Sequence, residues 1–418
     1  MERKGTRLPV WTALLSAALV ALWGCFLPWK RALAGQNDFL ALYVGATLAG
    51  TPDLYSPPVF ERMQKKTANI RMPAVLFSRP PFYAVLLKPL AAMPYPAAYL
   101  LFQVLSVAAL VSALRVLAPR GDPLWLLGGM SIPVLTAFIN GQDVLLVLAA
   151  AAASIALWRR GFTFASGLVL SLCAIKFHFF LFVPFALLFR RQWRQLGGAA
   201  TGLVTFYGIG AAAQGWRWPM NYLRFLQFLR NPELTPAPYT MPNIHGLVMA
   251  AFGDARGLEI AVAALTALGV LYVLARADEF ELTLALAIAA GLLINVHTYI
   301  QDYCLLMLLP AVAARDSMAR KFGLALLAPP AYFLLMADGP AGAAVPLAVA
   351  AAIASAVIHW KRRPYSSTTA AATPNFGMEI SVTPSCSNSS TGLGASPGAS
   401  SFAPANSPGS RTVTSSTG

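Results

Sequence analysis

Long apolar runs separated by short polar turns make up most of the chain. A helix that crosses a bilayer needs about 20 apolar residues, with about 17 as a practical minimum. On this scale the pattern predicts about twelve spans, with ten to thirteen possible because several runs are short. The runs fall near 8–29, 94–118, 123–140, 143–158, 162–178, 179–189, 195–214, 257–275, 280–297, 303–314, 321–338 and 343–360. The predicted fold is therefore an all-α, polytopic transmembrane protein.

The composition supports this interpretation. The 418 residues are 57% hydrophobic and only 11% charged, whereas a soluble domain carries about 25% charged residues. The net charge of +15 comes mostly from short basic clusters between apolar runs, as the positive-inside rule requires. No nucleic-acid-binding motif is present, so nucleic acid is not an expected partner. The four cysteines have neither metal-ligand spacing nor a disulfide pattern.

The basic clusters also predict the orientation. Every second loop is short and basic if the N-terminus is cytoplasmic and the run 8–29 is a retained signal-anchor. This places two long loops, 30–93 and 215–256, on the outer side of a bacterial-type inner membrane. We expect a transmembrane domain over 1–363 and a disordered Ser/Thr/Pro/Gly-rich tail over 364–418. Loop 30–93 is itself basic, which predicts contact with lipid headgroups or with a phosphorylated ligand.

Short elements are expected inside the two outer loops. An amphipathic helix is predicted over 39–49, with Asn37 or Asp38 as its N-cap, and an interfacial helix over 57–68. The apolar stretches 82–93 and 247–252 are too short to span, so they are expected to lie at the membrane surface or re-enter it.

Ionisable side chains at the outer ends of apolar runs are the first candidates for function, because a membrane makes them costly. Asp38 is the first carboxylate after Glu2, and Lys176 and His178 close the fifth run. For Lys176 alone, a lysine that snorkels to the interface is an equally good explanation. His178, and the immediate return of the chain into the membrane, favour a site.

The histidines show the same asymmetry. His178, His245 and His297 fall on the outer side, and His359 lies at the inner end of the last run. A single histidine is more often structural than catalytic. Three on the same side as Asp38 favour a functional group of residues.

Two outer turns carry further polar candidates. Gln142 follows Asn140-Gly141 and is a candidate site residue, whereas Asp143 is expected to cap the next helix. His297 and Gln301 share one helical face at i, i+4 spacing, and Asp302 is either a site residue or a cap.

Arg79 in the first outer loop is followed by two prolines that restrict its backbone. Its planar guanidinium suits a phosphate. A lipid headgroup is nearly as good a partner.

The order of these motifs resembles the GT-C class of polyprenol-phosphate-sugar-dependent glycosyltransferases. It is most similar to glycosyltransferase family 87, which is related to bacterial alpha-mannosyltransferases. The matching pieces are Asn37-Asp38-Phe39 with Tyr43, Asp53-Leu54-Tyr55, Arg79-Pro80-Pro81 before Pro89-Leu90-Ala91, Gly141-Gln142, and Ile175-Lys176 before Arg190-Arg191-Gln192-Trp193-Arg194.

The resemblance implies a lipid-phosphate sugar donor that is reached from the outer leaflet, and a catalytic base, which here is Asp38. Lys176, Arg79 and His178 are then expected to hold the donor phosphate. Sugar or acceptor contacts are expected from Tyr43, Gln142, His245, His297, Gln301 and Asp302. The expected partners are a polyprenyl-phosphate-linked sugar, a lipid or glycan acceptor and membrane lipids, with no cofactor and no metal. The alternatives are a transporter or flippase of a lipid-linked or small polar substrate, and a non-catalytic assembly protein.

Overall fold

The computed structural model describes residues 29–68, 75–119, 121–229, 241–277, 279–313, 317–331 and 347–351. Every regular element in these ranges is a helix, which confirms the all-α prediction. The run 8–29 apart from Trp29, residues 230–240 of the second outer loop, most of the run 343–360 and the tail 364–418 lie outside the described ranges.

Several described helices are long and apolar enough to cross a membrane. They are α6 (Tyr95–Leu117), the continuous pair α10 (Thr163–Leu170) and η2 (Ser171–Phe180), α12 (Trp193–Gln214) and α15 (Arg256–Arg276). A fifth candidate is the pair α7 (Pro123–Gly129) and α8 (Ile132–Asn140), which is bent by 41°. The chain is thus a multi-pass membrane protein, and five of the predicted runs correspond to these helices.

The predicted total of twelve spans is not confirmed, because the helices described at the other predicted apolar runs are shorter. These are α9 (Val144–Arg159), α11 (Val183–Phe189), α16 (Phe280–Ile294), η5 (Ile300–Met307), α17 (Leu308–Val312) and α18 (Met318–Leu327). In α16 all but two residues are buried. Its uniform apolarity therefore reflects burial among other helices rather than contact with lipid.

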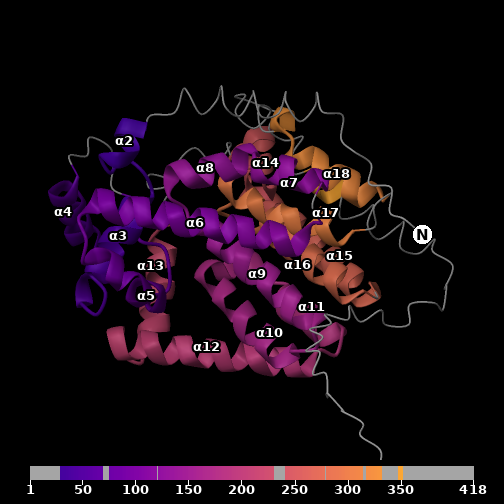
Figure 1. Ribbon diagram of the computed structural model, residues 1–418, viewed down its shortest axis with the longest axis horizontal. Coiled ribbons are helices and arrows are strands. Elements are labelled where there is room, and N and C mark those ends of the chain that lie inside the picture. Colours follow the sequence, from indigo (N-terminus) through magenta and orange to yellow (C-terminus); the bar gives the residue numbers. More distant parts are fainter. Residues whose placement is uncertain are drawn as a thin grey trace, which may run out of the picture. The chain divides into compact units, whose positions relative to one another are not determined.

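Helices α10 and α12 pack against each other (Figure 1), and glycines allow their close approach. A Cβ on Gly167 would lie 1.8 Å from the Gln195 carbonyl oxygen, and one on Gly198 would lie 2.0 Å from that of Phe164. Small residues at such a crossing are typical of membrane helices. Gln195 Nε2 donates to Ser166 Oγ at 2.8 Å in the same interface, which pairs two buried polar groups.

The segment predicted to be the first outer loop folds into α2 (Trp29–Leu33), α3 (Phe39–Thr47), η1 (Pro52–Tyr55), α4 (Pro57–Thr67) and α5 (Pro81–Ala91). The helices predicted over 39–49 and 57–68 are confirmed. The prediction that the first of them is amphipathic is wrong, because α3 is apolar on all sides and packs against α4, α5 and α6 (Figure 1). The second outer loop contributes α13 (Trp218–Phe228) and α14 (Ile244–Phe252).

Candidate active site

Aromatic packing fixes the position of Asp38. The residue precedes α3, and the next side chain, Phe39, is fully buried against Tyr99 and Phe102 of α6, with ring centroids 5.6 and 4.9 Å away. Asp38 occupies the N-cap position, but its carboxylate caps no backbone N–H. It accepts a hydrogen bond from Gln142 Nε2 at 2.6 Å instead.

A glycine turn brings Gln142 to that carboxylate. Gly141 follows the last residue of α8 as its C-cap, and its φ of +60° is the left-handed conformation that glycine adopts at little cost. A Cβ at this position would also lie 2.5 Å from the Cβ of Phe39. Gly141 therefore lets the turn lie directly against the start of α3, and Gln142 faces Asp38.

Arg79 joins the same turn through a two-point ion pair. Its Nε donates to Asp143 Oδ2 at 2.6 Å and its Nη2 donates to Oδ1 at 3.0 Å. Nη2 also lies 3.4 Å from Gln142 Oε1. Asp143 was predicted to be a helix cap, and it does occupy the N-cap position of α9. The capping role is wrong, because its side chain accepts no cap hydrogen bond and binds Arg79.

Two tyrosines hold the backbone on which Arg79 sits. The Tyr55 hydroxyl donates to the Arg79 carbonyl oxygen at 2.8 Å, and the Tyr222 hydroxyl donates to that of Ser78 at 2.9 Å. Tyr55 ends the Asp53-Leu54-Tyr55 motif, and Tyr222 belongs to α13. Both outer loops therefore position this arginine.

Lys176 approaches from a break in its helix. The backbone there leaves helical geometry (φ −121°, ψ 56°) inside the 3₁₀ segment η2. Lys176 Nζ lies 2.5 Å from Asp302 Oδ1, 3.4 Å from Gln142 Oε1 and 3.5 Å from Asp143 Oδ1. Asp302 lies in a second long 3₁₀ segment, η5. Runs of this kind above about four residues are uncommon and often mark functional positions.

Asp302 is a helix cap, as one of its two predicted roles required, and it also pairs with Lys176. One carboxylate oxygen binds Lys176, and the other accepts the backbone N–H of Tyr299 at 2.9 Å in a capping box.

Gln142 is the centre of the resulting network. Its amide N–H group donates to Asp38, and its carbonyl oxygen accepts from Lys176 and Arg79. The network holds three carboxylates against two cations, so it carries one excess negative charge when all five groups are ionised. The side chains of Asp143, Lys176 and Asp302 are at most 4% exposed, whereas Arg79 is 12% exposed.

The surroundings of Asp38 alter its acidity. The residue lies outside the candidate spans, and burial raises the pKa of its carboxyl. The Gln142 hydrogen bond and the charges of Lys176 and Arg79 oppose that rise without cancelling it. The group is thus a stronger base than an ordinary aspartate when it is ionised.

The remaining candidates lie at different distances from the network. His178 lies close enough to Lys176, Arg79 and His297 to interact with them electrostatically. Gln301 is buried in η5, directly before Asp302. Two other candidates have partners elsewhere: the Tyr43 hydroxyl donates to the Met93 carbonyl at 2.7 Å, and His245 Nδ1 lies 3.0 Å from Glu259. Among the described residues, no group of three His, Cys, Asp or Glu side chains is arranged to hold a metal.

These features define a multi-pass α-helical membrane protein with a largely buried, charged cluster built from the loops 30–93 and 215–256, the turn after α8 and the two 3₁₀ segments η2 and η5. Residues 77–296, more than half of the chain, match glycosyltransferase family 87. The chain belongs to this family and is a glycosyltransferase, which acts on a sugar donor and an acceptor. No curated protein and no solved structure matches the chain.

The family assignment favours the transferase over the transporter alternative. The matched segment includes Arg79, Gln142 and Lys176, whereas Asp38 and Asp302 lie outside it. Asp143 is the site member that the sequence analysis assigned to another role. Its position directly after Gln142, in the turn between α8 and α9, was the signal that could have identified it.

Proposed function

We propose that this glycosyltransferase moves a hexose, mannose-like, from a polyprenyl-phosphate donor to a lipid or glycan acceptor. In this proposal the reaction takes place on the outer face of a bacterial-type inner membrane, with the N-terminus cytoplasmic. The observation that carries it is the Gln142 bridge, which joins the Asp38 carboxylate to the two cations Arg79 and Lys176. A base and a phosphate-binding pair are thereby held on opposite ends of one amide.

Such an arrangement suits a displacement at the anomeric carbon. Asp38 takes the proton of the acceptor hydroxyl as its oxygen attacks. The bond between the anomeric carbon and the phosphate oxygen breaks, and polyprenyl phosphate leaves with the bonding electron pair. Direct displacement inverts the anomeric centre. Arg79 and Lys176 stabilise the charge that develops on the leaving phosphate, and His178 adds a third donor beside them.

The donor phosphate has competitors within the site. Asp143 and Asp302 bind the two cations. Arg79 has the most exposed side chain of the four charged groups that pair there, so the phosphate meets Arg79 first. In the proposal Gln142, His297, Gln301 and Asp302 bind sugar or acceptor hydroxyls. In the proposal Tyr43 and His245 extend the acceptor side.

The test is donor consumption by the purified full chain in lipid vesicles, with labelled polyprenyl-phosphate hexoses of different sugars. The wild-type protein should consume one of them, and the mannosyl donor is the first choice. The anomeric configuration of the product, read by NMR, should be opposite to that of the donor. Asp38→Asn should abolish transfer, and Lys176→Ala should weaken use of the donor more than use of the acceptor.

Glu61→Gln is the matched control, because it removes an exposed carboxylate from the same outer loop. Its activity should equal that of the wild type. Full activity in a well-folded Asp38→Asn protein would show that Asp38 is not the base. Equal effects of Lys176→Ala on the use of both substrates would show that Lys176 does not bind the donor phosphate.

A further inference from the structure

One tyrosine beside the proposed active site has a hydroxyl without a partner. Tyr83 is the third residue of α5, four positions after Arg79, and it is only 3% exposed. Its hydroxyl group is buried, and it has no hydrogen-bond partner among the described residues. Such groups are rare in folded proteins, because burial without a hydrogen bond costs free energy. The Tyr83 hydroxyl is therefore expected to gain an acceptor in another state of the protein.

Other tyrosines of the same region show that the missing partner is a feature of Tyr83. Five of them donate their hydroxyls to oxygen atoms 2.7 to 3.0 Å away: Tyr43, Tyr55, Tyr95, Tyr99 and Tyr222. The helix that carries Tyr83 is also fixed, because Phe82 stacks on Phe206 of α12 with ring centroids 4.4 Å apart. The position of the Tyr83 hydroxyl is thus set by packing.

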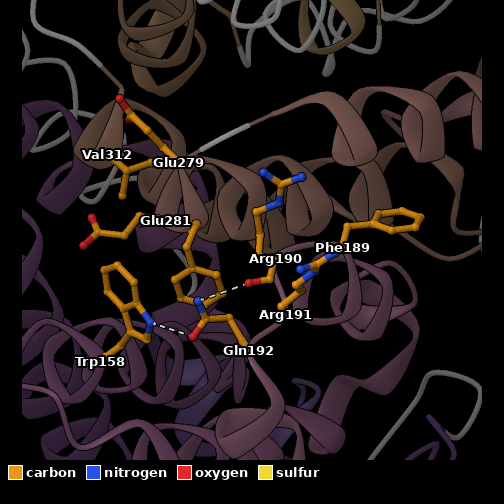
Figure 2. A pocket seen from close by; sticks show the side chains of 9 residues that line it. Trp158, Phe189, Arg190, Arg191, Gln192, Glu279, Glu281 and Val312 are labelled. Carbon is orange, nitrogen blue, oxygen red and sulfur yellow. Dashed lines mark hydrogen bonds between the residues drawn. The ribbon is translucent and has the colours of Figure 1, made fainter. Parts of the chain in front are cut away.

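A hollow of about 530 Å³ lies at the other end of α9, where several polar groups do have partners. Figure 2 shows that Trp158 Nε1 donates to Gln192 Oε1, at 3.0 Å, and that Gln192 donates to the Arg190 carbonyl oxygen. Glu281 binds Arg159 at 2.5 and 2.7 Å. Arginines and glutamates both line this hollow, so it does not select a ligand of either charge.

The Tyr83 hydroxyl lies near enough to the Arg79–Asp143 ion pair to interact electrostatically with both residues. Asp143 is fully buried, and its two oxygens accept from Arg79 at 2.6 and 3.0 Å. Lys176 approaches only Oδ1, so Arg79 is the sole donor to Asp143 Oδ2 among the described residues. A phosphate that binds Arg79 competes for the same N–H groups. The loss of this donor leaves a buried carboxylate oxygen unpaired, which is costly.

We propose that Tyr83 is a positioning residue that replaces Arg79 as the partner of Asp143 when the donor phosphate binds. The Arg79 guanidinium turns toward the phosphate, and the Tyr83 O–H donates to Asp143 Oδ2 in its place. No covalent bond changes and no proton is transferred. The new hydrogen bond lowers the free energy needed to separate Arg79 from Asp143, so it strengthens donor binding. This inference rests on the proposed polyprenyl-phosphate donor.

The experiment measures binding of undecaprenyl phosphate to the purified full chain in detergent micelles, with undecaprenol as the comparison that lacks the phosphate. The wild type should prefer undecaprenyl phosphate. Tyr83→Phe should weaken its binding about fivefold, as expected for one hydrogen bond of ordinary net strength, and should leave the binding of undecaprenol unchanged. The melting temperature of Tyr83→Phe should be no lower than that of the wild type, because the removed hydroxyl has no partner.

Two tyrosine variants serve as matched controls. Tyr207→Phe removes a hydroxyl that donates to the Trp216 carbonyl in an exposed place, and it should bind undecaprenyl phosphate as the wild type does. Tyr99→Phe removes a buried hydroxyl that has partners, and it should melt at a lower temperature. An equal fall in the melting temperature of Tyr83→Phe would show that its hydroxyl already has a partner, which would overturn the proposal.

A double-mutant cycle tests whether Tyr83 acts through Asp143. Asp143→Asn removes the charge that the hydroxyl is proposed to hold, so in this background Tyr83→Phe should change the binding by less than about twofold. A loss of about fivefold that persists there would place the hydroxyl on the phosphate itself and overturn the proposal. Equal affinities of Tyr83→Phe and the wild type for undecaprenyl phosphate would refute this inference alone. If the wild type does not prefer undecaprenyl phosphate to undecaprenol, the proposed donor is wrong and the inference fails with it.

Discussion

Arg79 and Asp143 form a two-point ion pair, with contacts of 2.6 and 3.0 Å, although 64 residues separate them in the chain. The pair joins the first outer loop to the start of α9, and the Asp143 side chain is fully buried. Such a pair adds little net stability when it is intact, but the loss of one partner strands a charge. The pair therefore fixes the positions of these two residues relative to each other. Removal of one partner, rather than of both, is what lowers the free energy of unfolding most.

Asp143→Asn should lower the free energy of unfolding by about 3 kcal/mol, because Arg79 then loses its charged partner in a buried position. Titration with SDS in mixed micelles measures this quantity. The double variant Arg79→Gln/Asp143→Asn should lose less than the sum of the two single variants. Strictly additive losses would mean that the pair is not coupled.

The raised pKa of Asp38 predicts a pH effect on catalysis. A general base works only when it is ionised, so the rate falls as the pH falls through the pKa. Burial raises this pKa above the usual value of about 3.9, so the acidic limb of kcat/KM should lie at a higher pH than that of an ordinary aspartate. Gln142→Leu removes a hydrogen bond that lowers the pKa and should move the limb further upward. If the Gln142→Leu variant is active but its acidic limb of kcat/KM has not moved, Asp38 is not the base that this limb reports.

The same shift makes a prediction about stability. A carboxyl whose pKa is higher in the folded state favours folding below its unfolded pKa, and this contribution is lost as the pH rises through the folded pKa. At neutral pH the charge on the partly buried Asp38 therefore opposes folding. Asp38→Asn should melt at a higher temperature than the wild type at neutral pH, and the difference should shrink in acid. A lower melting temperature at neutral pH would show that ionised Asp38 stabilises the fold.

Much of the site was predictable because a membrane makes polar residues conspicuous. Asp38, Gln142 and Lys176 stood out as polar groups at the outer ends of apolar runs, and the structure places them within one hydrogen-bonded network. Their pairing was not predictable. Whether Arg79 binds Asp143 or a headgroup depends on contacts across 64 residues, and no local pattern encodes these.

The helix lengths were the less predictable part of the fold. Apolar runs such as 143–158 and 280–297 predict spans, and the structure has helices there. Hydropathy alone does not separate a helix that faces lipid from one that is buried in protein. Helix α16 is buried on nearly all sides. In the same way, the apolarity of α3 comes from its burial under α5 and α6, so the predicted amphipathic face is missing.

Tyr55→Phe should act on the donor through Arg79. The change removes a hydroxyl that donates to the Arg79 carbonyl, at a net cost of about 1 kcal/mol. With the loop less constrained, the KM for the donor should rise several-fold, whereas kcat changes less. Tyr207→Phe is the control, since it removes a comparable bond to the Trp216 carbonyl in an exposed place. Equal KM values for the donor in the two variants would show that Tyr55 does not contribute to donor binding.

Gly141→Ala tests whether the turn must lie against Phe39. An alanine there meets two obstacles: a φ of +60°, which costs about 1 kcal/mol for a side chain, and a Cβ 2.5 Å from that of Phe39. Gly161→Ala meets only the first, because its φ is +82° and nothing lies within 4 Å of the added Cβ. Both variants should be less stable than the wild type by the free energy that a side chain costs at positive φ. Only Gly141→Ala should also lose most of its transfer activity, since Gln142 and Asp38 are pushed apart. Similar activity in the two variants would mean that the approach of Phe39 and Gly141 does not set the geometry of the site.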